Sequence, residues 1–174
     1  MLLCAIDPGL RHCSYALFDG AVLRQAGLVH NPAKTGNGPA AWVEMGQAVA
    51  RALDASTGAQ CIGQLVIEGQ KVYQASRQGR TVGADPNDLI ELSGVCGVLA
   101  VTVGEVAEVR RVMPSDWKGT TDKTICQLRV NKRLSDSEQL AILWPGAAGK
   151  DSALAHNVYD AIGIGLHAVG RWSK

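Results

Sequence analysis

The chain has 174 residues, of which 47% are hydrophobic and 19% are charged, so it can build the core of one compact domain. Its longest apolar run, SGVCGVLAVTVG, is too short to cross a bilayer, and charged residues interrupt the N-terminal segment before it could form a signal-peptide core. The formal net charge of +1 argues against a uniformly basic nucleic-acid binder. We therefore expect a single domain spanning 1–174, with no membrane partner, in the cytoplasm.

The first part of the chain alternates apolar runs with turn residues. Residues 2–6 form an apolar run that ends in Asp-Pro-Gly. Two further runs, CSYALFDG and AVLRQAGLV, meet at an Asp-Gly pair, which is a hairpin signal. We expect three antiparallel strands, followed by a helix in AWVEMGQAVARAL and a buried strand in QLVIE, which ends at Glu68.

Helix signals dominate the second part of the chain. Asp85 as N-cap and Pro86 as first helical residue predict a helix over 86–104. EVRRVM is predicted to be a strand, and a basic helix starts near Asp122. SDSE has the pattern of a capping box that begins a short helix, and LAHNVYDAIGIG belongs to a final helix. This order of elements predicts an α/β fold, with a mixed sheet and helices packed on its faces.

Basic residues gather in two stretches although the net charge is small. Between Arg110 and Arg133 there are seven basic residues and only two acidic ones. The stretch GQKVYQASRQGRTVGA contains Lys71, Arg77 and Arg80 and no acidic residue. One such stretch alone is typical of an ordinary solvated face, but two of them favour a polyanionic partner.

Three acidic residues stand where predicted elements meet the core. Asp7 follows the first strand, Glu68 ends the QLVIE strand, and Asp160 lies in the final helix. Taken singly, each is explained by a turn, a solvated strand end or a solvated helix face. If the three converge, they repel one another unless a cation neutralises them, and a set of oxygen ligands suits Mg²⁺ or Mn²⁺ better than zinc.

The acidic residues lie in segments that resemble a known family. AIDPGLRHCSYALFDG, LVIEGQ and HNVYDAIGIGLHAVGR resemble the three acidic motifs of the RuvC-type Holliday-junction resolvases, in a form seen in phage and prophage relatives. PNDLIELSGVCGVL and MPSDWKGTTDKT resemble segments between these motifs, so the resemblance covers nearly the whole chain. It implies a ribonuclease H-like fold: a mixed five-stranded sheet, with three antiparallel strands and then parallel ones, and helices on both faces.

The resemblance also implies an activity. It predicts a magnesium-dependent endonuclease that cuts branched DNA, above all four-way junctions, in a bacterial cell or a phage-infected host. Two Mg²⁺ ions, for which Mn²⁺ can substitute, would be held in each site by Asp7, Glu68 and Asp160 and would drive phosphodiester hydrolysis. Symmetric cutting needs two active sites, which implies a homodimer. The 86–104 helix is a candidate interface through an apolar stripe formed by Leu89, Leu92, Cys96 and Leu99, although burial against its own sheet explains the stripe equally well.

One further residue is expected to assist Asp160. In the better-known bacterial resolvases this partner stands three residues before the last aspartate, where the present chain has Asn157, and His156 is one residue further back. Both lie on the helix face of Asp160. Because an imidazole binds divalent metals better than a neutral amide, we favour His156 as the catalytic metal ligand and keep Asn157 as the alternative.

DNA phosphates are expected to contact the two basic stretches. We place Arg77 and Arg80 near the junction centre, with Lys71 in the same stretch. The candidate contacts along the DNA arms are Lys118, Lys123, Arg129, Lys132 and Arg133.

Three other interpretations of the sequence stay open. A ribonuclease H-like nuclease could act on an RNA–DNA hybrid or, less selectively, on branched DNA. An actin-like phosphotransferase also begins with an apolar strand and an Asp-Gly-type turn, but it needs a second domain and a phosphate loop for which the sequence has no glycine-rich segment. A DNA-binding scaffold without catalysis conflicts with the three intact acidic residues.

Overall fold

A five-stranded sheet forms the centre of the molecule. The structure, a computed structural model, describes residues 1–33, 37–58, 60–70, 85–103 and 108–172. The strands are β1 (Leu2–Asp7), β2 (His12–Asp19), β3 (Val22–His30), β4 (Ile62–Glu68) and β5 (Glu108–Val112). Their spatial order is β3-β2-β1-β4-β5, with β1 to β3 antiparallel and with β4 and β5 parallel to β1. This is the mixed sheet that the sequence predicts.

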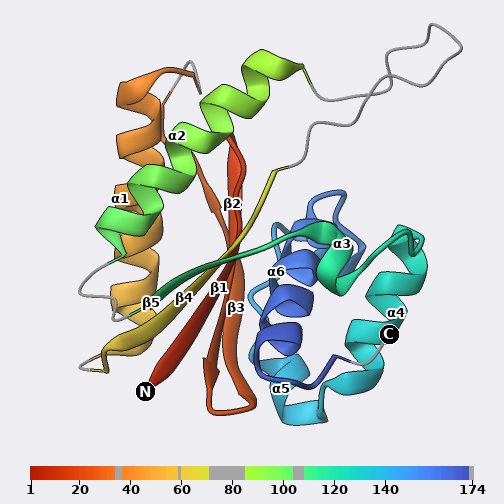
Figure 1. The fold of residues 1–174 in the computed structure, drawn as a ribbon. Coiled ribbons are helices and arrows are strands. Elements are labelled where there is room, and N and C mark those ends of the chain that lie inside the picture. Colours follow the sequence, from red (N-terminus) through yellow and green to blue (C-terminus); the bar gives the residue numbers. More distant parts are fainter. Residues whose placement is uncertain (34–36, 59, 71–84, 104–107, 173–174) are drawn as a thin grey trace, which may run out of the picture.

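Helices cover both faces of the sheet, which confirms the predicted α/β architecture (Figure 1). The helices are α1 (Pro39–Thr57), α2 (Pro86–Thr102), α3 (Pro114–Trp117), α4 (Lys123–Arg133), α5 (Asp136–Leu140) and α6 (Ala155–Ala168), with a 3₁₀ turn, η1 (Gly149–Asp151). Helices α1 and α2 pack together on one face, and α6 lies on the other face beside α3, α4 and α5. Within the described ranges, no helix is long and apolar enough to cross a membrane.

Local signals in the sequence form the turns and caps expected of them. The Asp-Gly turn joins β2 to β3, with Gly20 at a φ of 57°. Asp85 caps α2 through its side chain, and Ser135 and Glu138 form the predicted capping box of α5. Helix α3 is not among the predicted elements, because a helix of four residues is too short to show a helical period in the sequence.

The sheet has a separate core on each face because successive strand residues point to opposite sides. Cys4 belongs to the core beneath α1 and α2, whereas Ala5 belongs to the core beneath α6. Continued to the end of β1, this alternation places Asp7 on the α6 face. In β4, Val66 also lies in the core beneath α6, so Glu68 two residues later shares that face.

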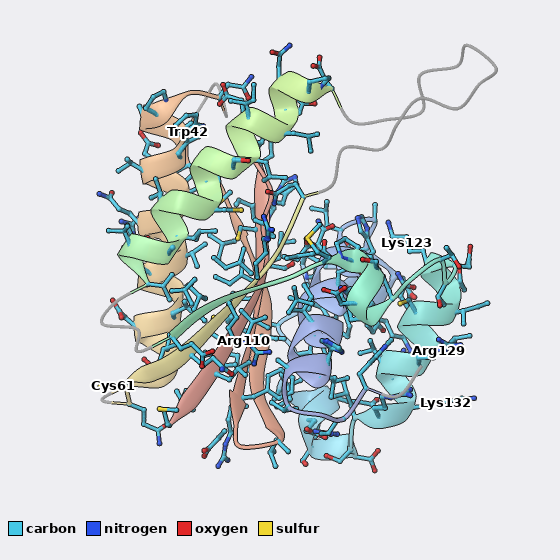
Figure 2. The ribbon with its side chains drawn as sticks, in the orientation of Figure 1. Trp42, Cys61, Arg110, Lys123, Arg129 and Lys132 are labelled. Atoms are coloured by element: carbon cyan, nitrogen blue, oxygen red, sulfur yellow. The ribbon has the colours of Figure 1, made fainter. Side chains whose placement is uncertain are left out.

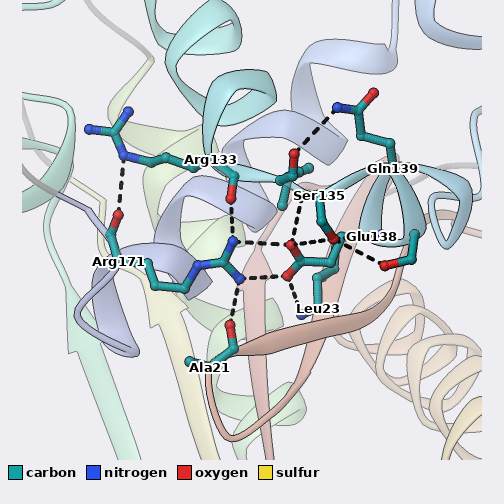
Figure 3. Close-up of polar contacts among 9 residues, drawn as sticks. Ala21, Leu23, Arg133, Ser135, Glu138, Gln139 and Arg171 are labelled. Atoms are coloured by element: carbon teal, nitrogen blue, oxygen red, sulfur yellow. Dashed lines mark hydrogen bonds and ion pairs between the residues drawn. The ribbon is translucent and has the colours of Figure 1, made fainter.

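A buried ion pair joins four segments at the end of the sheet near the β2–β3 turn (Figure 3). Glu138 is only 4% exposed, and its Oε1 and Oε2 lie 2.5 and 3.1 Å from the guanidinium nitrogens of Arg171. The backbone N–H of Leu23 donates to Oε1 at 2.8 Å. Arg171 also donates to the backbone carbonyls of Ala21 and Arg133. The pair therefore ties the β2–β3 turn to α4, α5 and the segment after α6.

We expect Arg171→Met to lower the free energy of unfolding by about 2–3 kcal/mol, because the substitution leaves the buried Glu138 carboxylate without its partner. The matched control is Arg24→Met, which breaks the exposed Arg24–Asp19 pair and should leave the free energy of unfolding nearly unchanged. Urea unfolding monitored by circular dichroism measures both. Equal stabilities of the Arg171 variant and the native protein would contradict the structural role of the pair.

The same pair should make the effect of Arg171→Met depend on pH. Burial by itself raises the pKa of Glu138, but hydrogen bonds from Arg171, Leu23 and Ser135 outweigh it and lower the pKa to about 2. A carboxyl group with a lowered pKa stabilises the fold above its unfolded pKa of about 4.3, and this stabilisation is lost as the pH falls toward 2. The stability difference between variant and native protein should therefore be full at pH 6 and shrink between about pH 4.3 and 2.

Candidate active site

Three carboxylates meet at the carboxyl end of β1 and β4. Asp7 ends β1 and Glu68 ends β4, and because the two strands are parallel neighbours their ends lie side by side. Both strands turn these residues toward α6, which carries Asp160. Asp7 is close enough to Glu68 and Asp160 for the charges of both carboxylates to raise its pKa. The structure thus brings together the three acidic residues that the sequence singles out.

Helix α6 approaches α3 and the sheet closely because two of its residues are glycines. A Cβ on Gly163 would overlap the ring of Trp117, and a Cβ on Gly165 would overlap the ring of Phe18. Near its start, the helix is also tied to β2, since the Ser14 hydroxyl donates a hydrogen bond of 2.6 Å to the backbone carbonyl of Asn157. These contacts hold α6, and with it Asp160, at the strand ends.

Lys118 lies between two of the carboxylates. Its Nζ is 3.4 Å from Oε1 of Glu68 and 3.3 Å from Oδ2 of Asp160. The three side chains are largely shielded from water, with exposed fractions of 24% for Lys118, 14% for Glu68 and 19% for Asp160. The charge pattern of the sequence groups Lys118 with the contacts along the DNA arms. The structure instead gives it two ion pairs inside the acidic site.

Trp117 fixes both Glu68 and Lys118. Its indole N–H donates to Oε1 of Glu68 at 3.0 Å, and the ammonium of Lys118 lies 4.8 Å from the centre of its ring. The indole N–H of Trp172 in turn donates to the backbone carbonyl of Trp117 at 2.5 Å. Because Trp117 is fully buried and is itself held by Trp172, its hydrogen bond leaves the Glu68 carboxylate little freedom to rotate.

The electrostatics of the site favour a cation. Burial raises the pKa of Asp7 well above its ordinary value, and the charges of Glu68 and Asp160 raise it further, with Lys118 opposing. Burial also raises the pKa of Glu68, against the opposing effect of Lys118. For Lys118, burial works in the opposite direction, but the two neighbouring carboxylates raise its pKa above the ordinary lysine value. Added positive charge would therefore stabilise the ionised carboxylates.

The donor set suits a hard divalent cation, although its present arrangement is not a closed ligand shell. In the part of the chain that the structure describes, no group of three or more His, Cys, Asp or Glu side chains is already arranged around one metal position. The space between Glu68 and Asp160 holds the Lys118 ammonium instead. Carboxylate oxygens on converging strands and a helix are the ligands that Mg²⁺ and Mn²⁺ prefer, so the residues fit such ions.

His156 and Asn157 both lie in the first turn of α6, about one helical turn before Asp160, and both are half-buried. Nδ1 of His156 lies 2.7 Å from the backbone carbonyl oxygen of Ala153. Because a carbonyl oxygen only accepts, Nδ1 carries a hydrogen and donates a hydrogen bond to it. A neutral ring then has its lone pair on Nε2. Asn157 uses its backbone carbonyl to accept from Ser14.

The predicted DNA contacts fall into three groups. Lys123, Arg129 and Lys132 lie on α4, on the same side of the molecule as α3 and α6 (Figure 2). Arg133 packs over the ring of Trp172 at 4.9 Å and donates to backbone carbonyls of Arg129 and Arg171, so its guanidinium serves the fold. The remaining three predicted contacts, Lys71, Arg77 and Arg80, lie outside the described residues.

Two arginines of β5 form a basic feature that the sequence analysis did not select. Arg110 and Arg111 are exposed on this edge strand, and Arg110 is labelled in Figure 2. Both line a cavity of about 360 Å³ between α2 and β5, whose wall also includes Glu68 and Gln70. The only sequence signal for them is their charge, which they share with many solvated residues.

The structure resembles solved resolvases over nearly its whole length. Thermus thermophilus RuvC in complex with a Holliday junction substrate matches with a TM-score of 0.59 and 17% identity, covering 99% of each chain. A structure of Thermus thermophilus RuvC matches with a TM-score of 0.58 and 18% identity, covering 97% of this chain and 94% of that chain. The fowlpox virus Holliday junction resolvase matches with a TM-score of 0.55 and 15% identity, covering 98% of each chain.

Comparison of the sequence gives no such match. No protein-family model matches the chain, and no curated protein matches it significantly. At this level of identity, the solved structures establish that the chain has the RuvC-type, ribonuclease H-like fold. They thereby confirm, at the level of the fold, the resemblance found in the sequence motifs.

The crowding of carboxylates predicts that the acidic site weakens the fold when no metal is bound. In protein kept in chelator, Asp7→Asn should raise the free energy of unfolding by about 1–2 kcal/mol, because it removes a buried charge that is repelled by Glu68 and Asp160. Since the pKa of Asp7 is raised in the fold, the gain should be small at about pH 4 and grow as the pH rises. Thermal unfolding followed across this pH range would measure the gain, and a loss of stability at pH 8 would refute the prediction.

Proposed function

We propose that the protein is a divalent-metal-dependent endonuclease that cuts branched DNA, with the four-way junction as its main substrate. The observation that carries the proposal is the meeting of Asp7, Glu68 and Asp160 at one end of the sheet, in a fold shared with Holliday junction resolvases. A fold hosts many functions, so the weight rests on these carboxylates and on their need for a cation.

In this proposal, Asp7, Glu68 and Asp160 hold two Mg²⁺ ions, or Mn²⁺ in their place. When bound, such ions would supply Lewis-acid chemistry for the attacking water, the phosphate charge and the leaving 3′ oxygen. The protein supplies the positioning. Trp117 fixes the orientation of Glu68, and the Ser14 hydrogen bond fixes the start of α6 against β2. The largely buried setting strengthens each of these electrostatic interactions.

His156 is our proposed fourth metal ligand, and Asn157 is the alternative. The hydrogen bond from Nδ1 of His156 to the Ala153 carbonyl supports this choice, because it fixes the tautomer whose Nε2 carries the lone pair. Ligating histidines commonly donate their other ring nitrogen in this way. The position three residues before the last aspartate supports Asn157 instead.

DNA phosphates would contact α4 and, at the junction centre, the basic stretch over 69–84. The exposed side chains of Lys123 and Lys132 and the half-buried Arg129 support the first contact. The absence of acidic residues from the 69–84 sequence supports the second. Such contacts give binding that weakens steeply with salt.

A homodimer would supply the two active sites that symmetric cutting requires. Helix α2 is the candidate interface, but through a different face from the stripe suggested by the sequence. That stripe includes Leu99, which is fully buried in the core with α1, and Cys96, which packs against the same core. The opposite side of α2 exposes Ile90 and Val101, which are 66% and 80% accessible.

Cleavage of labelled substrates tests the proposed activity. Four-way junction, fork, duplex and RNA–DNA hybrid are incubated in parallel with and without Mg²⁺. We expect cutting of the junction that depends on metal and falls at least about a hundredfold in Asp7→Asn, Glu68→Gln and Asp160→Asn, while DNA binding is kept. Native-like cleavage by correctly folded Asp7→Asn would show that the metal-site assignment is wrong. Preferential cutting of the RNA–DNA hybrid would show that the four-way junction is not the main substrate.

The histidine assignment is tested in the same assay by titration with Mg²⁺ and Mn²⁺. His156→Ala should raise the metal concentration required for half-maximal cleavage, or abolish cleavage, because a ligand is lost. Asn157→Ala is the matched comparison on the next position. If His156→Ala behaves like the native protein and Asn157→Ala does not, the fourth ligand is Asn157.

Sedimentation analysis tests the dimer. We expect the native protein to sediment as a dimer and Ile90→Glu with Val101→Glu to sediment as a folded monomer, because burying two carboxylates in an apolar contact is strongly unfavourable. Leu140→Glu is the control, since Leu140 is 87% exposed on α5. A native protein that stays monomeric both free and bound to a junction would exclude the homodimer.

A further inference from the structure

Lys118 occupies the position between the carboxylates that a metal ion would need. Its ammonium group contacts Oε1 of Glu68 and Oδ2 of Asp160, one from the sheet and one from α6, at 3.4 and 3.3 Å. Two carboxylates from separate elements are thus bridged by one cation. Lys118 follows directly after α3, whose last residue, Trp117, is fully buried, so the base of the lysine side chain is held firmly.

The bridge uses the same oxygen atoms that a divalent cation would use. Oε1 of Glu68 already accepts from the indole N–H of Trp117 as well as facing Lys118. An ammonium group and a divalent cation cannot lie between the same two carboxylates, because both occupy the space and each repels the other. A single ammonium also carries less positive charge than the three neighbouring carboxylates carry negative charge, so the site is left with an excess of negative charge.

We propose that Lys118 is a built-in counter-ion, which partly neutralises the acidic site of the metal-free protein and is displaced when a divalent cation binds. The inference rests on the proposed function, since it concerns the same carboxylates. Lys118 therefore sets the metal affinity of the site, and does so by competition. Its flexible four-carbon side chain allows the ammonium to leave the carboxylates while the backbone stays in place.

Competition predicts a combination of effects that neither a structural nor a simply catalytic lysine produces. A lysine that only stabilises the fold would, when replaced, lower stability without raising metal affinity. A lysine that only assists cleavage would change the rate and leave metal binding alone. A displaced counter-ion is recognised by weaker folding without metal together with tighter binding of metal.

Binding of Mn²⁺ in the absence of DNA, measured by calorimetry, tests the inference directly. Lys118→Met, which keeps the length of the side chain and removes its charge, should bind Mn²⁺ about tenfold more tightly than the native protein. The variant should also have a lower Tm in chelator, and this difference should disappear in saturating Mn²⁺. Lys150→Met, at an exposed lysine on η1, is the matched control and should alter neither property.

A second measurement uses the native protein and so does not depend on the folding of a variant. Amine acylation followed by mass spectrometry reports how accessible each lysine is. Adding Mg²⁺ should raise the labelling rate of Lys118 severalfold, because its ammonium leaves the carboxylates, and should leave Lys150 unchanged. Labelling of Lys118 that stays the same or falls at saturating Mg²⁺ would overturn the inference.

The outcomes separate this inference from the proposed nuclease function. If the native protein binds Mn²⁺ and cleaves junctions, but Lys118→Met binds Mn²⁺ no more tightly, the counter-ion role is wrong and the nuclease assignment stands. If neither protein binds Mn²⁺ or Mg²⁺, both are overturned. Tighter Mn²⁺ binding by Lys118→Met, together with greater labelling of Lys118 in Mg²⁺, supports the displacement.

Discussion

Helix α6 reaches the end of the sheet because two of its residues have no side chain. The rings of Trp117 on α3 and Phe18 on β2 fill the space that a Cβ on Gly163 or Gly165 would require, so α6 packs closely against both α3 and the sheet. This contact holds Asp160 beside the carboxylates of the strands. A side chain at either glycine would overlap these rings and push α6, with Asp160, away from its place. The geometry of the site is therefore set by the packing of the core beneath it.

The charges of the site are arranged differently from those of the ion pair at the opposite end of α6. Glu138 meets one arginine and several backbone groups, and its low pKa shows that its charge is fully compensated. Asp7, Glu68 and Asp160 share a single lysine, and the pKa values of Asp7 and Glu68 are raised rather than lowered. Uncompensated buried charge costs stability and is characteristic of functional sites. The balanced pair thus lies where segments are joined, and the unbalanced cluster lies where added positive charge would stabilise the carboxylates.

Patterns that extend over a few neighbouring residues were enough to predict much of the molecule. The Asp-Gly turn, the cap at Asp85 and the order of the apolar runs indicated the mixed sheet, whereas the meeting of Asp7 with Glu68 was implied only by the resemblance of the acidic motifs. Contacts between distant segments were not predictable in this way. Arg133 resembles the other basic residues of α4 in sequence, yet its place over Trp172 depends on where the end of the chain lies. Lys118 likewise differs from Lys123 only through its contacts with strands and helices far away in sequence. A charge pattern counts such residues but cannot tell a solvated side chain from a buried partner.

The four charged groups of the site come from regions that are widely separated along the chain. Asp7 lies on the first strand and Glu68 on the fourth, while Lys118 follows α3 and Asp160 lies on α6. Contacts of this kind require long loops to close, and this entropic cost is met only when the surrounding core forms with them. The four groups can therefore meet only once α6 has docked on the sheet. The complete set of charged groups is consequently a property of the finished fold, in which strands from the start of the chain and a helix from its end lie together.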